Sequence, residues 1–377
     1  MIHHQVIVVG GGPAGSACAR ALVAAGLDVV VMDAARFPRD KVCAGWLTPQ
    51  VVAELELDVD EYRQGRTFQP FTGFRVGLVG GRREVEVDYG RPVSFGIRRV
   101  EFDDYLLRRS GAPLSLGVPL TSLRREDGRW IVNDAMTAPM LVGAGGHRCP
   151  VARRLNGTCD AIGRGTLVVA QEAELAIEPR DASAFTTRPD VPALYFCRDL
   201  RGYGWCIRKQ DSVNVGLGRL VGHALPAAIA AFERFLAARG EVPPRAPWRW
   251  RGHAYLVRGG ARRRVVDAGV LLAGDAAGLA CPQSGEGIRP AVESGLLAAA
   301  MIVAARGEYS ADRLAPYESR LRARFADGSV GRPRAGGVPA ALAAVLGRGL
   351  LRQPSFVRRV VLDRWFLRAG EPILSAA

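Results

Sequence analysis

Three glycines near the start of the chain have the spacing of a phosphate-binding turn, Gly10-x-Gly12-x-x-Gly15. The apolar run Val6–Val9 before them predicts a strand buried on both faces, and the residues after them, to about Ala25, predict a helix. In such a turn the first glycine permits a sharp bend, the second lets the backbone approach a pyrophosphate, and the third lets helix and strand pack closely. The N-terminus of the helix supplies free N–H groups for the anion.

A second apolar run, Val29–Met32, ends at Asp33. This is the spacing at which an acidic residue accepts hydrogen bonds from an adenosine ribose, and a carboxylate there disfavours the 2′-phosphate of NADP. The alternative is a glycine turn followed by a solvated Asp33. Strand, turn, helix and acid together favour a dinucleotide site.

Further chemistry is indicated far downstream, where the apolar run Val270–Leu272 leads into Gly274-Asp275 and then Pro282, Gly285-Glu286-Gly287 and an Ala/Leu-rich helix. The two glycine clusters are consistent with the two ends of one FAD site. Asp275 is expected to accept hydrogen bonds from the ribityl chain, with a turn or helix-capping aspartate as the alternative. The N-terminus of the helix after Gly287 is placed to stabilise negative charge on reduced flavin. Pro282 is expected to brace the loop, and Glu286 to point away or cap the helix.

Composition restricts the function classes. The formal net charge is +14, and every basic residue except Lys41 and Lys209 is arginine. This favours anionic partners such as FAD, a diphosphate substrate or a membrane surface. The basic residues are scattered and no nucleic-acid motif is present, which argues against nucleic acid. The seven cysteines contain no CxxC pair, so neither a disulfide framework nor a metal site is predicted.

The N-terminus enters a strand within a few residues and leaves no room for a signal peptide, and no uncharged apolar run reaches the length of a membrane span. These features predict a cytoplasmic protein, with peripheral membrane contact left open. The sequence carries no signal for an oligomeric state.

Two kinds of segment alternate along the chain, which predicts an α/β fold with a Rossmann-like FAD-binding domain and an inserted antiparallel β-sheet domain for the substrate. Strands are expected at Phe74–Val79, Glu84–Asp88, Val93–Ile97, Pro119–Leu123, Trp130–Val132 and Met140–Val142, and helices at about Val100–Ser110 and Ala227–Ala238. The FAD-binding domain is assigned to residues 1–65, 98–165 and 263–316, the substrate domain to 66–97 and 166–262, and a helical C-terminal region to 317–377.

The C-terminal region is rich in arginine interspersed with large apolar residues. At 100° per residue the arginines between Phe356 and Arg368 do not gather on one face. A helical cap packed on the protein is therefore favoured over a membrane-surface helix.

Three motifs together resemble the geranylgeranyl reductase family, whose members have the para-hydroxybenzoate hydroxylase fold: the N-terminal glycine turn, Phe37-Pro38-Arg39-Asp40-Lys41-Val42-Cys43-Ala44-Gly45, and Gly274-Asp275…Pro282…Gly285-Glu286-Gly287. The likeness covers nearly the whole chain. Arg99-x-x-Phe102-Asp103 and Tyr203-Gly204-Trp205 match further family motifs, and Gly143–Pro150 stands where related hydroxylases have Gly-Ala-Asp-Gly.

The resemblance implies roles for individual residues. Cys43 would lie on a loop over the flavin and donate a proton, with Arg39 or Lys41 tuning its pKa; a packing cysteine is the alternative. Arg99 would lie near the pyrophosphate or ribityl group, or else on the surface. Tyr203 and Trp205 would line the substrate cavity, or belong to the sheet core, and Trp46 would narrow the flavin entrance. The predicted FAD-binding residues are Gly10, Gly12, Pro13, Ala14, Gly15, Asp33, Ala34, Lys41, Cys43, Ala44, Gly45, Arg99, Gly274, Asp275, Pro282, Gly285, Glu286, Gly287 and Ile288.

Two departures from the family pattern concern substrate and donor. Ile207-Arg208 follows Trp205 where the family has Phe-Pro, and Gly145 stands where related hydroxylases have the aspartate that handles FAD and NADPH. The expected function is FAD-dependent reduction of carbon–carbon double bonds in an isoprenoid or other hydrophobic molecule, by hydride transfer from flavin N5. NAD(P)H or a ferredoxin-like protein would supply the electrons.

Two other functions stay open. One is a flavin monooxygenase acting through a C4a-hydroperoxide; the related halogenases carry Trp-x-Trp-x-Ile-Pro, of which this chain has only Trp205 and Ile207. The other is a flavin-binding protein with a regulatory role.

Overall fold

The computed structural model describes residues 1–157, 167–178, 185–222, 224–243, 246–258, 263–325 and 340–374. Cys159 and the predicted domain boundaries at 165/166 and 262/263 lie outside or at the edge of these ranges. The domain boundaries therefore remain a prediction.

The apolar runs of the sequence form a six-stranded sheet in the order β19-β20-β13-β2-β3-β9. Five strands run parallel to one another along β20-β13-β2-β3-β9, and every residue of β2 and β13 is buried, as continuous apolar runs require. The strands are β2 (Val6–Val9), β3 (Val29–Asp33), β9 (Leu114–Leu116), β13 (Met140–Gly143), β19 (Val266–Asp267) and β20 (Val270–Leu272).

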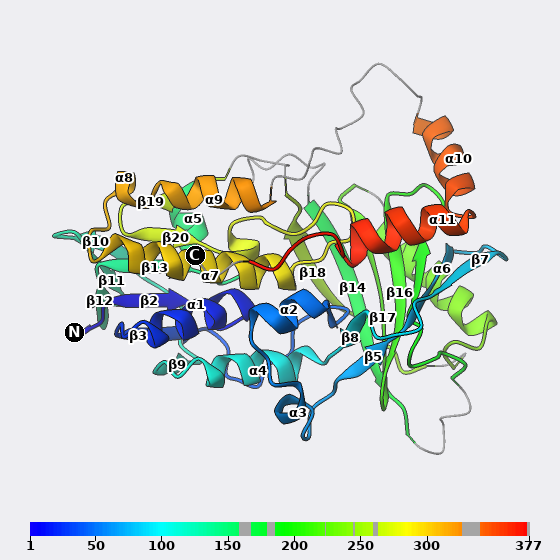
Figure 1. Cartoon of the computed structure of the whole chain (residues 1–377), viewed down its shortest axis with the longest axis horizontal. Helices are drawn as coiled ribbons and strands as arrows, with labels where there is room; N and C mark the ends of the chain where they lie inside the picture. The colour runs from blue at the N-terminus through cyan, green and yellow to red at the C-terminus, as the bar shows by residue number, and fades with distance from the viewer. Residues whose placement is uncertain are drawn as a thin grey trace.

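Two helices that follow the glycine motifs cover this sheet side by side, α1 (Pro13–Ala24) and α7 (Ile288–Ala305) (Figure 1). A Cβ atom on Gly295 of α7 would lie 2.2 Å from the carbonyl oxygen of Ala14 in α1. The close approach of the two helices therefore depends on glycine at this position. It brings the N-termini of both helices to one cavity.

A small sheet, β1-β12-β11-β10, extends this half of the molecule. Its strands are β1 (Ile2–His3), β10 (Leu123–Glu126), β11 (Arg129–Val132) and β12 (Met136–Ala138). The strand predicted at Pro119–Leu123 was wrong, because the strand begins only at Leu123. The Asn133 side chain accepts from the amide of Thr121 at 2.8 Å and donates to the carbonyl of Pro119 at 2.8 Å, so this backbone is satisfied as a loop.

The second large sheet has seven strands in the order β18-β14-β17-β16-β15-β6-β7 and is antiparallel except at β15–β6. It unites residues 73–88 with residues 167–256, at the right of Figure 1. The strands are β6 (Gly73–Leu78), β7 (Glu84–Asp88), β14 (Leu167–Ala176), β15 (Ala193–Phe196), β16 (Gly202–Lys209), β17 (Ser212–Leu220) and β18 (Arg251–Leu256). Helix α6 (Leu225–Ala238) packs on it through Ile229, Phe232 and Leu236.

Shorter elements join the two halves. A three-stranded sheet is formed by β4 (Trp46–Leu47), β8 (Ser94–Gly96) and β5 (Gln69–Phe71). The short helices are α2 (Pro49–Glu54), α3 (Val59–Tyr62), α4 (Arg99–Arg109), α5 (Pro150–Asn156), α8 (Ala311–Leu314) and α9 (Pro316–Phe325), together with the 3-10 turn η4 (Gly274–Ala276).

The C-terminal region forms a helical cap, as predicted. It contains α10 (Ala340–Leu350), α11 (Pro354–Phe356) and the π-helical segment η5 (Val357–Phe366). Val357, Val361, Leu362 and Phe366 are buried in one apolar cluster with Phe74 and other residues of the seven-stranded sheet. The last described residues run back along α7 (Figure 1), where Arg289 donates to the carbonyl of Pro372 at 2.9 Å.

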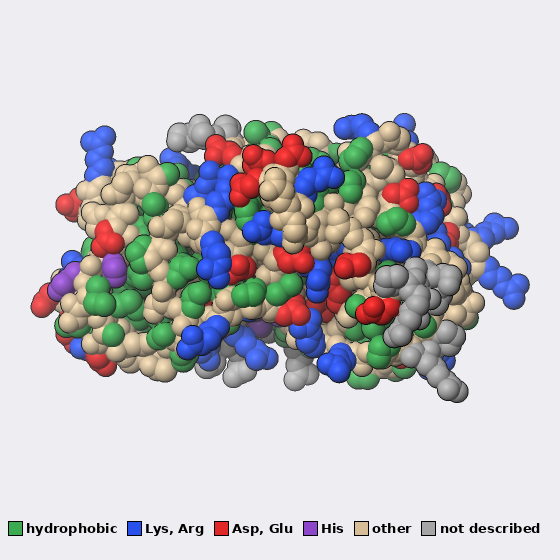
Figure 2. Space-filling model, turned by 90° about the horizontal axis from the view of Figure 1, so that it is seen from below, with side chains coloured by type: hydrophobic (Ala, Val, Ile, Leu, Met, Phe, Trp, Pro, Cys, Tyr) green, Lys and Arg blue, Asp and Glu red, His purple; other side chains and the backbone are tan. Residues whose placement is uncertain are grey.

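Helix α7 is long and apolar enough to cross a membrane, but 67% of it is buried inside the protein. It is therefore a core helix, packed against α1 and α9. On the face seen in Figure 2, basic and acidic side chains are interspersed rather than gathered by sign.

Candidate functional site

A cavity of about 480 Å³ lies where the two halves of the molecule meet, and both glycine motifs open into it. Three of the predicted site residues, Gly15, Gly45 and Pro282, do not line it. The predicted residues that line it are Gly10, Gly12, Pro13, Ala14, Asp33, Ala34, Lys41, Cys43, Ala44, Trp46, Arg99, Tyr203, Trp205, Gly274, Asp275, Gly285, Glu286, Gly287 and Ile288.

The first end of the cavity is the turn between β2 and α1. Gly10 has φ +115°, and a Cβ there would lie 2.4 Å from the carbonyl oxygen of Ala144, so only glycine fits. Gly15 does not line the cavity but packs against this turn, because a Cβ atom at this position would lie 1.8 Å from the carbonyl oxygen of Gly10. Asp33 accepts from the amides of Gly11 and Ala35, each at 2.8 Å, which fixes its carboxylate at the cavity wall.

These residues fit the adenosine diphosphate half of FAD. Each oxygen of Asp33 keeps lone pairs for ribose hydroxyls, since each accepts only one amide. The first turn of α1 directs its N-terminal N–H groups to the place where a pyrophosphate would lie.

Two arginines share the buried carboxylate of Asp103 beside this turn. Arg99 donates to it twice, at 2.7 and 2.8 Å, and Arg39 once, at 2.9 Å. Burial opposes the charge of Arg99, but Asp103 and a hydrogen bond with Cys43 together raise the pKa of Arg99 above its ordinary value. Arg99 is thus a fixed cation inside the cavity, next to the one cysteine in its lining.

The second end of the cavity is built from η4 and the loop that leads into α7. Glu286 caps this helix, because its Oε1 accepts from the amide of Arg289 at 2.6 Å. The hydroxyl of Tyr203, on β16, donates to the carbonyl of Ser284 and ties the loop to the seven-stranded sheet. The N-terminus of α7 at Gly287 therefore points into the cavity from a rigid loop, which fits the ribityl and ring portion of FAD.

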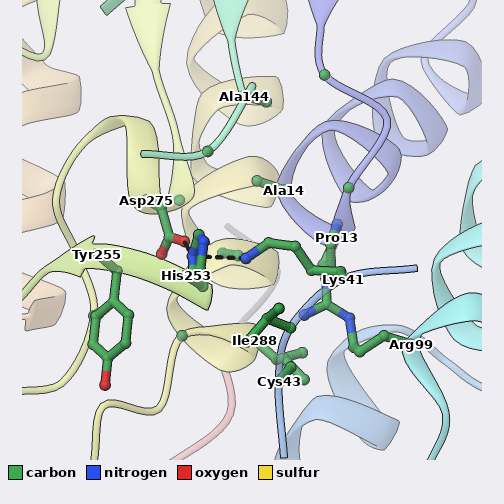
Figure 3. A pocket seen from close by; sticks show the side chains of 18 of the residues that line it. Pro13, Ala14, Lys41, Cys43, Arg99, Ala144, His253, Tyr255, Asp275 and Ile288 are labelled. Carbon is green, nitrogen blue, oxygen red and sulfur yellow. Dashed lines mark hydrogen bonds and ion pairs between the residues drawn. The ribbon is translucent and has the colours of Figure 1, made fainter. Parts of the chain in front are cut away.

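His253 on β18 completes a polar cluster at this end (Figure 3). Its Nε2 lies 2.7 Å from Nζ of Lys41 and 3.8 Å from Oδ2 of Asp275. Burial lowers the pKa of both Lys41 and His253, and the Asp275 carboxylate opposes this for each. A neutral imidazole accepting from the ammonium group satisfies the short contact without repulsion.

The Asp275 carboxylate is ionised in this cluster. Burial opposes its charge, but the neighbouring His253 side chain and the charge of Lys41 hold the pKa of Asp275 below its usual range. An ionised carboxylate is the acceptor that ribityl hydroxyls require.

The remaining wall of the cavity is aromatic. The indole of Trp46 is stacked between Phe74, at 4.9 Å and 24°, and Phe366 of the cap, at 5.5 Å and 18°. Tyr203 and Trp205 line the same region from β16. Such a wall suits a flat or extended apolar molecule.

Several lining residues were not predicted from the sequence, above all His253, Tyr255 and Phe366. His253 and Tyr255 alternate on β18, and this spacing is a detectable signal for a shared face. Phe366 had no local signal, because its position depends on how the cap folds back.

The chain is similar to proteins of known class. Residues 5–75 match the family model "FAD dependent oxidoreductase". The chain is 33% identical over 324 residues to menaquinone reductase of Mycobacterium tuberculosis, covering 79% of this chain and 76% of that protein. It is 27% identical over 340 residues to digeranylgeranylglycerophospholipid reductase 2 of Methanosphaera stadtmanae, covering 85% and 83%.

Among solved structures, a geranylgeranyl bacteriochlorophyll reductase-like protein of Thermoplasma acidophilum superposes with a TM-score of 0.74 at 22% identity, covering 100% of this chain and 94% of the other. This likeness confirms the fold. The sequence relatives and the family model, which the site geometry fits, identify the chain as an FAD-dependent oxidoreductase that belongs to the geranylgeranyl reductase family.

Proposed function

We propose that the protein reduces carbon–carbon double bonds of a hydrophobic isoprenoid molecule, and that the cavity residues named above bind FAD and substrate. The observation that carries the proposal is the union, in one cavity, of an FAD-type motif pair, a cysteine and an aromatic wall. The named activities of the relatives from Mycobacterium tuberculosis and Methanosphaera stadtmanae support it.

Bound in this cavity and reduced by the electron donor, the flavin would supply a hydride to one carbon of the double bond. The Cys43 thiol supplies the proton to the other carbon, which leaves a thiolate that regains a proton from solvent, so that one double bond becomes a single bond. The cationic Arg99 side chain beside Cys43 stabilises the thiolate. The stacked Trp46, Phe74 and Phe366 side chains exclude water from the apolar substrate.

For the electron donor we propose a reduced nicotinamide or a ferredoxin-like protein. Asp33 makes the N-terminal site unsuitable for NADP itself, because the carboxylate would repel a 2′-phosphate. A nicotinamide donor would therefore react from a position outside this pocket.

The test is anaerobic. The FAD-loaded protein is reduced with dithionite under argon and mixed with a geranylgeranyl compound that carries no quinone ring, and the return of oxidised-flavin absorbance is followed. The fully saturated analogue of that compound is the control. Reoxidation only by the unsaturated compound supports the reductase; reoxidation by air alone, with oxygen incorporated into a substrate, supports the monooxygenase instead.

We also propose that the protein is cytoplasmic and contacts a membrane surface through α10. Three apolar side chains on this helix are exposed, Val345 by 53%, Leu346 by 56% and Leu350 by 44%. They lie on one side of the helix, which is at the outer edge of the molecule (Figure 1). Exposed Arg352 follows the helix, and Arg348 on the helix donates to the carbonyl of Arg198, which is also exposed. Apolar side chains flanked by arginines match an anionic lipid surface.

Flotation with vesicles tests this contact. We expect binding to vesicles of phosphatidylcholine with phosphatidylglycerol, weaker binding to phosphatidylcholine alone, and loss of binding in the V345S/L346S/L350S variant. V303S is the matched control, since Val303 on α7 is 41% exposed and lies outside this surface. Equal binding by both variants would overturn the assignment.

A further inference from the structure

Both backbone groups of Cys43 are held by side chains of the seven-stranded sheet. The carboxylate of Glu172 on β14 accepts from the Cys43 amide at 2.7 Å. The amide nitrogen of Asn214 on β17 lies 3.4 Å from the Cys43 carbonyl oxygen and 3.3 Å from the Glu172 carboxylate. The loop that carries the thiol is thus anchored to the sheet and not only to its own half of the molecule.

The orientation of Asn214 is fixed by Trp205. The indole N–H of Trp205 donates to Oδ1 of Asn214 at 2.7 Å. Because an indole nitrogen can only donate, the Asn214 oxygen must face Trp205, and the Asn214 NH₂ group must face Glu172 and Cys43. Gly216 makes this contact possible: a Cβ there would lie 2.1 Å from the Trp205 ring. The Tyr-x-Trp motif residue Trp205 therefore acts on Cys43 through Asn214, besides lining the cavity.

We propose that Glu172 and Asn214 are positioning residues that hold the Cys43 thiol in place for proton donation. The inference rests on the proposed function of Cys43, but the hydrogen bonds that carry it do not. Glu172 is 1% exposed, so its hydrogen bond with the loop is shielded from water.

The charges around Glu172 support this role. Burial raises the pKa of Glu172 to about 7, although Lys209, the Cys43 amide and Asn214 lower it. Nζ of Lys209 lies 3.4 Å from the carboxylate of Glu174. Although burial acts to raise the pKa of Glu174, the charge of Lys209 helps to hold this pKa below its ordinary value. Arg251 is 3.9 Å from Glu172 at the edge of the sheet. Glu174 is therefore the nearer ion-pair partner of Lys209, while one carboxylate oxygen of Glu172 binds the loop amide and the other lies near Arg251.

Hydrogen exchange of the FAD-bound protein tests the anchor, read by mass spectrometry on peptides that cover Lys41–Leu47. In E172A the Cys43 amide loses its acceptor, and we expect exchange of this segment to accelerate about tenfold. E172Q keeps a carbonyl acceptor of the same length and should exchange as wild type. E241A is the matched control, because Glu241 is an equally buried glutamate in the same half of the molecule. Its carboxylate accepts hydrogen bonds from Tyr195 and Arg239 and not from the Cys43 loop.

The functional arm measures reoxidation of the reduced flavin by substrate. E172A should slow the rate at saturating substrate with little change in KM and an increased solvent isotope effect, whereas E172Q should restore the rate. N214A should show the same pattern and replaces E172A if that variant does not fold. Unchanged exchange in E172A and N214A, or faster exchange with an unchanged rate, would overturn the proposal. If wild type itself reacts with no isoprenoid, the proposed function fails, and exchange alone then decides whether Glu172 holds the loop.

Discussion

Nζ of Lys41 and Nε2 of His253, 212 positions apart in the chain, lie 2.7 Å from each other in the wall of the FAD cavity. The contact joins a loop of the first half of the molecule to β18 of the seven-stranded sheet. With Asp275 it forms one of the points at which the two halves meet at the cavity (Figure 3).

This contact predicts a pH dependence of stability. Burial, joined by the charge of Lys41, lowers the pKa of His253 below its ordinary value of 6.5, although Asp275 opposes this. Below about pH 6.5 the His253 imidazole therefore binds a proton in the unfolded chain but stays neutral in the folded protein. The free energy of unfolding decreases as the pH is lowered, by up to about 1.4 kcal/mol per pH unit. Denaturant unfolding between about pH 7 and 5 should show this decline flattened in H253N.

H3N is the control for the histidine, since His3 is exposed at the N-terminus. It should follow the wild-type pH dependence. A decline that is the same in H253N and wild type would contradict the prediction.

Replacing Cys43 should separate cofactor binding from chemistry. C43A and C43S should still bind FAD, because Cys43 is only one of the many residues predicted to contact it, yet substrate-driven reoxidation should slow by about 10²- to 10⁴-fold through loss of the acid. Stopped-flow absorbance measures the rate. C197A, which removes a buried cysteine remote from the cavity lining, should leave it unchanged. Full activity in C43A would show that the proton comes from another group.

Gly15 predicts a strong packing effect. In G15A the new methyl group would lie 1.8 Å from the carbonyl oxygen of Gly10, so the turn or α1 must move. We expect a loss of about 3 kcal/mol in the free energy of unfolding and weaker FAD binding. G349A, in α10, places its methyl group in open space and should be neutral or stabilising. Thermal unfolding and FAD titration measure both effects, and similar behaviour of the two variants would refute the argument.

Trp46 should limit the size of the substrate. Its indole fills the space between Phe74 and Phe366, so W46A should cost about 3 kcal/mol of stability and enlarge the aromatic end of the cavity. Relative reoxidation rates with prenyl chains of increasing length should shift toward the longer chains. W248A, which removes a tryptophan stacked on Trp250 at 5.1 Å outside the cavity lining, should leave this preference unchanged.

The sequence by itself determined the FAD-binding turn. Its parts lie within Val6–Asp33, where strand, glycines, helix and acid follow one another, and the structure places them together because local chain geometry suffices. The buried parallel strands and the helical cap were also predictable from apolar patterns. The strand prediction at Pro119–Leu123 was wrong because the Asn133 side chain forms hydrogen bonds with the backbone of this segment, in place of a neighbouring strand.

Only the tertiary structure decided which strand residues reach the cofactor and its loop. His253, Glu172 and Asn214 lie on three different strands, and the register of β14 with β17 and β18 aligns them toward Cys43 and Lys41. The local sequence around a polar residue on a strand does not predict which residue it will contact more than a hundred positions away. Such contacts follow from sheet pairing and from the docking of one half on the other, which is set by the whole buried surface rather than by any motif.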